Sequence, residues 1–121
     1  MLNRAAVLIS IVMLCASCQK FAEGRQIFHD LLALRDQVAT QFHEKVVDVN
    51  VSTNGRVTIK FINSPLNSAP HDVKQKRADE VAAFVISHYQ HPVSTVSTVF
   101  ASESGSVHFY ETFIGATAAK P

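Results

Sequence analysis

The stretch VDVNVSTNGRVTIKFI, residues 47–62, decides the fold because it predicts a β-hairpin. Apolar and polar residues alternate on both sides of its Asn-Gly pair, as they do in two half-buried strands joined by a tight turn. A two-residue loop would pair Val51 with Thr58 and place the two apolar sets on opposite faces of the sheet. A three-residue loop, residues 53–55, pairs Val51 with Val57 and keeps one apolar face. We therefore predict the three-residue loop, with its glycine in the left-handed conformation.

Two amphipathic helices are predicted, one on each side of this hairpin. The first runs from residue 20 to about residue 43, and the second runs from about residue 69 to residue 89, with Pro92 beyond its end. In both, apolar residues recur at intervals of three and four, and Ser68 is expected to cap the second. The first apolar stripe consists of Ile27, Leu31, Leu34, Val38 and Phe42, widened by Phe28 and Leu32; the second consists of Ala78, Val81, Ala82, Val85 and Tyr89.

Two further strands are predicted after the second helix, over residues 93–101 and 106–114, joined by residues 102–105. The resulting order is α-β-β-α-β-β. It predicts the α+β class, as a two-layer sandwich with two helices packed on one face of a four-stranded sheet. Residues 18–115 then form a single domain, and residues 116–121 are expected to be a disordered tail.

The N-terminal residues 1–17 have the composition of a secretory signal peptide. Arg4 supplies a positive charge, residues 5–14 form an apolar run broken once by Ser10, and the small residues 15–17 follow. The apolar run is shorter than the roughly 18 to 20 residues that a transmembrane helix needs. We therefore expect an exported protein.

Cys18 follows this segment and resembles the modified cysteine of the bacterial lipoprotein lipobox. The lipoprotein pattern usually has an aliphatic residue three places before the cysteine, whereas this chain has Cys15 there and Leu14 one place further out. The resemblance implies that Cys18 is diacylated and anchors the protein in the membrane. Gln19, in the place where Asp would retain the protein in the inner membrane, implies the outer membrane, facing the periplasm. Ordinary signal-peptide cleavage after Ser17 predicts the same cut without a lipid and stays open.

Composition narrows the classes of partner. The chain has 11 basic and 10 acidic residues, and loss of Arg4 with the signal brings the two numbers level. A net charge near zero argues against a nucleic-acid partner, which would require a basic excess or patch. No cysteine follows Cys18, so the domain must be stabilised by its apolar core, without a disulfide.

The candidates for chemistry are weak. Six histidines suggest a metal, but His88 and His91 flank the end of a helix and the sequence places no third ligand, so we predict neither a metal site nor a cofactor. No G-x-S-x-G or S-x-x-K motif is present, so we predict no catalytic residue and no enzyme. Glu111 alternates onto the apolar face with Phe109 and Phe113, where it either lies at a strand end near the rim or, if it is buried, has a raised pKa.

Two surfaces are the candidates for binding. The first is the loop of residues 63–70, in which two prolines restrict a run of polar side chains, as in many ligand-binding loops. The second is the sheet face that the helices leave open, which carries Thr58, Ile62 and Thr112 besides its candidate residues. The candidate contact residues are Asn63, Ser64 and Asn67 in the loop, and Lys60, His108 and Tyr110 on the open face.

Taken together, these features predict a non-enzymatic, lipid-anchored binding or accessory module of the cell envelope. Its expected partners are the membrane, through Cys18, and an envelope protein or a second copy of the chain. The alternative is a periplasmic protein that binds a small ligand or a metal.

Overall fold

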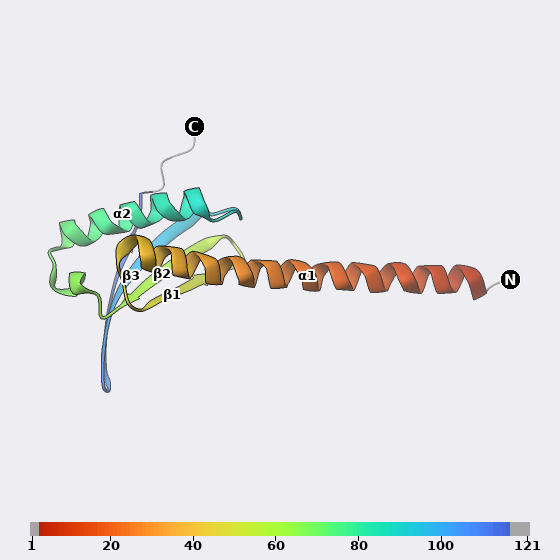
Figure 1. The fold of residues 1–121 in the computed structure, drawn as a ribbon, viewed down its shortest axis with the longest axis horizontal. Coiled ribbons are helices and arrows are strands. Elements are labelled where there is room, and N and C mark those ends of the chain that lie inside the picture. Colours follow the sequence, from red (N-terminus) through yellow and green to blue (C-terminus); the bar gives the residue numbers. More distant parts are fainter. Residues whose placement is uncertain (1–2, 117–121) are drawn as a thin grey trace. The chain divides into compact units, whose positions relative to one another are not determined.

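The computed structural model describes the backbone of residues 3–116, and the side chains of residues 23–106 and 108–116. It contains two helices, one short 3-10 helix and a four-stranded mixed sheet, which confirms the α+β class (Figure 1). The elements are α1 (Asn3–Phe42), β1 (Val47–Val51), β2 (Arg56–Ile62), η1 (Pro65–Ser68), α2 (His71–His88), β3 (Thr95–Ser104) and β4 (Val107–Ile114).

The chain divides into two units after Asp30, and the first unit contains the beginning of α1. The helix begins at Asn3, so the predicted start near residue 20 is wrong. Residues 3–42 contain no proline, and therefore nothing removes a helical hydrogen bond along this stretch. The predicted signal peptide (1–17) and the side chain of Cys18 lie outside the described side chains.

The end of α1 belongs to the second unit and has a defined cap. His43 adopts a positive φ of 55°, and the N–H of Glu44 donates to the carbonyl oxygen of Ala39 at 3.0 Å. This is the Schellman arrangement, which satisfies a carbonyl group that the last helical turn leaves unpaired. His43 therefore lies at the end of α1, where the sequence predicted the first helix to end.

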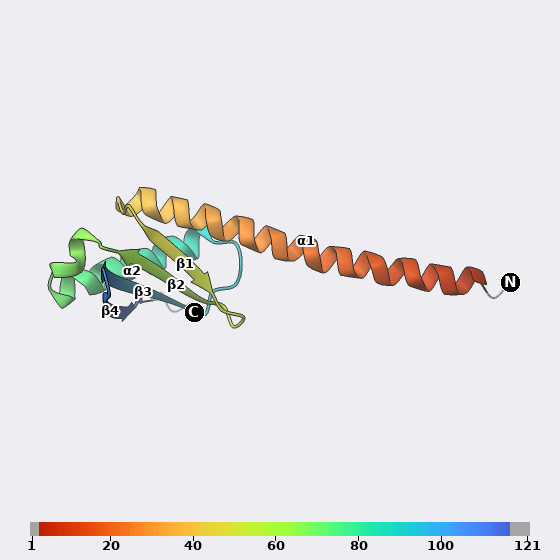
Figure 2. The same ribbon diagram turned by 90° about the horizontal axis from the view of Figure 1, so that it is seen from below.

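The strands lie in the order β1-β2-β3-β4, with β2 and β3 parallel and both outer pairs antiparallel (Figure 2). Val51 pairs with Val57, so the three-residue loop is confirmed. Gly55 in that loop has a φ of 80°, and a Cβ at this position would lie 2.9 Å from the carbonyl oxygen of Pro92. The Gly55 carbonyl also accepts a hydrogen bond from the N–H of Ser94 at 2.9 Å. The turn is thus tied to the chain segment that leads into β3.

The β3–β4 hairpin is longer than predicted, because residues 102–104 continue β3 instead of forming the connection. Ser104 pairs with Val107, which leaves a two-residue turn in which Gly105 supplies a φ of 60°. The last pair between β2 and β3 is Ile62 with Ala101. Residues 102–109 therefore extend beyond β2 as a two-stranded segment, visible as the blue hairpin in Figure 1; we call it the hairpin arm.

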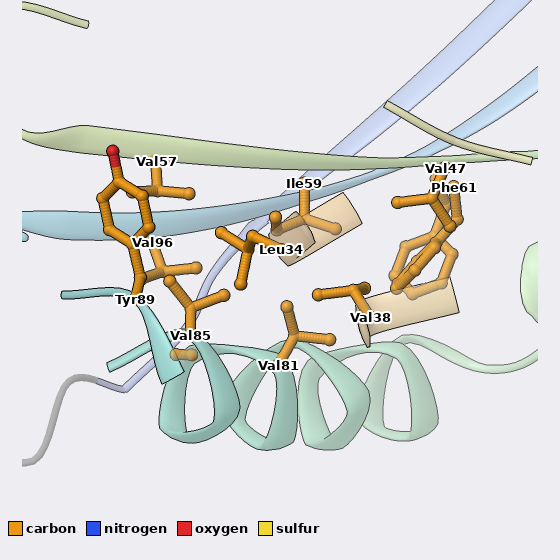
Figure 3. Close-up of a cluster of buried hydrophobic side chains, with 12 residues drawn as sticks. Leu34, Val38, Val47, Val57, Ile59, Phe61, Val81, Val85, Tyr89 and Val96 are labelled. Atoms are coloured by element: carbon orange, nitrogen blue, oxygen red, sulfur yellow. The ribbon is translucent and has the colours of Figure 1, made fainter. Parts of the chain in front are cut away.

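The core of the second unit lies on one face of the sheet (Figure 3). The stripe predicted for α2 is buried throughout, from Ala78 to Tyr89. Of the stripe predicted for α1, Leu34 and Val38 are buried, whereas Ile27 and Phe28, in the first unit, are 41% and 62% exposed. The strands contribute Val47, Val57, Ile59, Phe61, Val96 and Phe100.

The predicted tail (116–121) falls outside the described residues except for Ala116. The backbone N–H of Ala116 donates to Oδ1 of Asp79 on α2 at 2.8 Å.

Candidate functional site

A hollow of about 240 Å³ lies between η1, the first turn of α2 and the β3–β4 hairpin. It is smaller than the pockets of roughly 300 to 1,000 Å³ that enclose drug-sized ligands. We call it the hairpin pocket. Its lining consists of Asn67, Ser68, Lys74, Phe100, Ser102, Phe109 and Glu111.

The helical repeat of α2 and the alternation of β4 place the two charged residues of the pocket on the faces of these elements that pack together. Lys74 precedes Ala78 by four residues, so it extends the buried stripe of α2 by one turn. Glu111 pairs with Phe100 across the β3–β4 ladder, which places it on the helix-covered face, as its alternation with Phe109 indicated.

Lys74 and Glu111 form an ion pair with 2.9 Å between Nζ and Oε1. The side chain of Lys74 is 4% exposed, whereas that of Glu111 is 44% exposed. The hydrogen bond from Lys74 lowers the pKa of Glu111, and the positive charge of Lys74 and the nearby His71 act in the same direction. The expected rise in this pKa is therefore wrong, because desolvation is outweighed by the lysine.

Two acceptor atoms of the pocket have no hydrogen-bond partner among the described residues. They are Oδ1 of Asn67 and Oε2 of Glu111, and both are buried. Nδ2 of Asn67 donates to the carbonyl of Ala101 at 3.0 Å, and this hydrogen bond fixes which way the amide group is oriented. Nδ1 of His71 lies 3.7 Å from Oε2 of Glu111, beyond hydrogen-bond distance. Among the described side chains, Thr98 carries the third such atom, and it does not line the pocket.

The predicted loop site is mostly occupied by the protein itself. Nδ2 of Asn63 donates to the carbonyl of Glu103, and the N–H of Glu103 donates to Oδ1 of Asn63, at 3.2 and 2.9 Å. The hydroxyl of Ser64 donates to Oε1 of the buried Glu44 at 2.5 Å and accepts from the N–H of Leu66. Of the three predicted loop residues, Asn67 is the one that lines the hairpin pocket.

The capping prediction at this loop is wrong. Ser64 caps η1, and the N-cap of α2 is Pro70, which makes no side-chain hydrogen bond. Ser68 is unable to cap α2 because residues 65–68 already form the 3-10 helix.

The open sheet face brings together the other three predicted residues. Nζ of Lys60 lies 3.1 Å from Oε1 of Glu103 and 4.8 Å from the ring centroid of Tyr110. The rings of His108 and Tyr110 are nearly parallel, with centroids 6.4 Å apart. The hydrogen bond with Glu103 raises the pKa of Lys60, against a smaller opposing effect of desolvation. We call these four residues the open-face cluster.

The histidines occupy separate places in the described part of the chain. His88 stacks on Phe84 at the end of α2, with ring centroids 3.9 Å apart, and His71 lies beside Phe113. Among the described residues, no group of three or more His, Cys, Asp or Glu side chains is arranged to hold a metal ion.

The hairpin pocket combines groups that suit a ligand with polar edges and an apolar face. It offers acceptor oxygens, a buried ammonium group, serine hydroxyls and two phenylalanine rings. The sequence signalled Glu111 through its alternation. The position of Lys74, four residues before Ala78, is also a signal, but Lys74 lies in the polar first half of α2 and was not predicted.

Comparison of the chain with protein-family models, with curated proteins and with solved structures finds no match. Among the residues whose side chains the structure describes, no helix has both the length and the apolar character needed to cross a membrane.

Proposed function

We propose that the chain is an exported, lipid-anchored and non-enzymatic binding module of the cell envelope, which holds a small ligand in the hairpin pocket. The observation that carries the binding site is that two residues lining one hollow, Asn67 and Glu111, each have a buried acceptor atom without a hydrogen-bond partner, and that the buried Lys74 lines the same hollow.

A purely structural role accounts poorly for this arrangement. A buried polar atom left without a hydrogen bond costs about 1 to 3 kcal/mol, and nearly all such atoms in folded proteins are paired. Two of the three such atoms among the described side chains belong to residues that line the same pocket. Buried polar atoms without hydrogen-bond partners are typical of functional sites when several of them lie close together.

The anchor rests on residues 1–18, with Cys18 as the acylated residue and the outer membrane, facing the periplasm, as its place. The test is the intact mass of the chain from the membrane fraction of a bacterial host, beside the Cys18→Ser variant. A mass of residues 18–121 plus acyl groups, absent from the variant, supports the anchor. An unmodified chain free in the periplasm contradicts it.

The pocket is tested with the acylated chain in detergent, by recording protein NMR spectra with a library of neutral and charged fragments. Glu111→Gln changes the pocket, and Glu103→Gln is its matched control, because both glutamates lie on the β3–β4 hairpin and each pairs with a lysine of another element. Fragments that bind the wild type and Glu103→Gln but not Glu111→Gln support the proposal. A library that shifts no pocket residue contradicts it.

A second candidate function is docking of an envelope protein, or of a second copy of the chain, on the open-face cluster. It is favoured by the cation-π contact between Lys60 and Tyr110 and by the parallel rings of His108 and Tyr110. Fragments or proteins whose binding is lost in Glu103→Gln and kept in Glu111→Gln identify this face instead.

A further inference from the structure

The groups in the hairpin pocket constrain the chemistry of the ligand beyond its size. We infer that the pocket binds a single sugar residue, with hydroxyl groups on the Lys74, Asn67 and Glu111 side and with a ring face against Phe109. The inference rests on the proposed function, because it identifies the ligand class of the same site.

Charge is the first constraint. Lys74 and Glu111 are in contact at 2.9 Å, and the lysine keeps the carboxyl group ionised at neutral pH by lowering its pKa. The positive and negative charges therefore balance within the pocket. A cation would meet Lys74 and an anion would meet Glu111, so the pair favours a neutral ligand over either ion.

Hydrogen-bonding capacity is the second constraint. The unpartnered atoms, Oδ1 of Asn67 and Oε2 of Glu111, each require a donor. An ammonium group carries three N–H donors, and one N–H of Lys74 is directed to Glu111. A ligand that satisfies this set must both donate and accept hydrogen bonds while carrying no charge. Hydroxyl groups do both, and neighbouring hydroxyls on one ring supply several at fixed spacing.

The aromatic walls are the third constraint. Phe100 is 3% exposed and belongs to the base of the pocket, whereas Phe109 is 67% exposed although it lines the same hollow. Phe109 stands on the hairpin arm, opposite Ser102 on β3. A sugar ring has hydroxyls at its edge and C–H groups on its faces. The exposed ring of Phe109 offers an apolar surface to such a face, next to the polar groups that its hydroxyls need.

Volume is the fourth constraint. A hollow of about 240 Å³ has room for one sugar ring and not for an extended chain of them. Because Phe109 is exposed, further units of a longer saccharide would continue past it into solvent.

The test is saturation-transfer NMR on the acylated chain in detergent. The sugar probes are methyl α-glucoside, methyl β-galactoside and N-acetylglucosamine. The matched small probes are propylammonium, acetate and cyclohexanol. We expect transfer to the ring C–H protons of at least one sugar, and chemical-shift changes in the protein at Ser102, Phe109 and Glu111. With propylammonium or acetate we expect neither saturation transfer nor chemical-shift changes at these residues.

Four variants locate the binding. Phe109→Ala and Glu111→Gln are each expected to weaken sugar binding at least about tenfold, and Glu103→Gln is expected to leave it unchanged. Phe109 is 67% exposed, so its truncation should not unfold the chain, and circular dichroism of each variant verifies this. Phe109→Leu keeps an apolar side chain without a ring and should bind sugar as weakly as Phe109→Ala.

The outcomes separate this inference from the proposed function. If propylammonium or acetate binds in the pocket and no sugar does, the inference is wrong and the proposed function stands. If sugars bind equally well to Phe109→Ala, the ring contact is wrong and so is the inference. If neither the sugars nor the fragment library reach the pocket, both proposals fail.

Discussion

The two faces of the β3–β4 hairpin carry the same kind of ion pair in opposite surroundings. On the helix-covered face, Lys74 meets Glu111 at 2.9 Å, and on the open face Lys60 meets Glu103 at 3.1 Å. Lys74 is 4% exposed, whereas the side chains of Lys60 and Glu103 are 27% and 32% exposed. Distance hardly distinguishes the pairs, and the burial of the lysine does; Glu111 itself is 44% exposed, more than Glu103.

This difference decides what each pair does. Water screens the open-face pair, which is free to exchange its partners at little cost. On the helix-covered face, burial holds the ammonium group of Lys74 in place, and its contact at 2.9 Å directs the half-exposed carboxylate of Glu111. A ligand at the helix-covered face therefore meets groups already in place, whereas a partner at the open face meets groups that adjust to it.

The largest contrast between the faces is expected at adjacent residues of β2. Phe61 is fully buried on the helix-covered face, so Phe61→Ala should lower the free energy of unfolding by about 3 to 5 kcal/mol. Its control, Ile62→Ala, acts on the partly buried side chain of the open face and should cost about 1 kcal/mol. Urea denaturation followed by circular dichroism measures both. Equal losses would mean that the open face is covered in solution.

A smaller contrast is expected between two serines. Ser64→Ala removes the donor to the buried Glu44 and the cap of η1, and should lower the free energy of unfolding by about 1 to 3 kcal/mol. Ser97 lies partly buried on the open face, and Ser97→Ala should stay within about 0.5 kcal/mol of wild type. The same denaturation series measures both. A neutral Ser64→Ala would show that Glu44 finds another donor.

The two pairs should also differ in the pH range where each contributes. The pKa of Glu111 is lowered in the fold, so its contribution is complete above the ordinary carboxyl pKa and is lost as the pH falls through the folded value. The pKa of Lys60 is raised, so its contribution is complete below the ordinary lysine pKa and is lost as the pH rises through the folded value.

Unfolding measured across pH checks this assignment. Glu111→Gln should flatten the loss of stability in acid, and Glu103→Gln should flatten the loss in alkali. Glu111→Gln should leave the loss of stability in alkali unchanged, and Glu103→Gln should leave the loss in acid unchanged. If the loss of stability in acid is the same in Glu111→Gln as in the wild type, other carboxylates cause that loss.

The smallest effect is expected from the open face itself. His108→Ala combined with Tyr110→Ala should change the free energy of unfolding by less than about 0.5 kcal/mol, because both side chains are exposed. Urea denaturation again provides the measurement. If the same double variant loses an envelope partner in a pull-down, the open face is a docking surface, and recovery of the same proteins as wild type would remove that role.

Local patterns predicted much of the fold. The alternation around Gly55 fixed the β1–β2 register, and the spacing of Ala78, Val81 and Val85 identified the buried face of α2. These features depend on residues close together in the chain, where backbone periodicity determines which side chains share a face. The β3–β4 turn was misplaced because Ser102, Glu103 and Ser104 have the composition of a turn, although they pair as a strand.

The candidate site was predicted only in part, since it depends on contacts between distant segments. Asn63 is hydrogen-bonded to Glu103 because the parallel pairing of β2 with β3 brings these two residues side by side. Lys74 is buried because Glu111, on a strand at the other end of the chain, supplies its counter-charge. Neither partner can be identified from the residues around it.

The contact between Gly55 and the segment before β3 has a consequence for the order of folding. Both hairpins are local and can form early, whereas the parallel junction of β2 with β3 must wait until η1 and α2 have been spanned. The Gly55 carbonyl accepts a hydrogen bond from the N–H of Ser94 where that junction begins. We therefore expect the β1–β2 loop to adopt its native conformation before β3 pairs with β2. We therefore expect closure of this junction to be the slow step, and Gly55→Ala to act as a folding-rate variant.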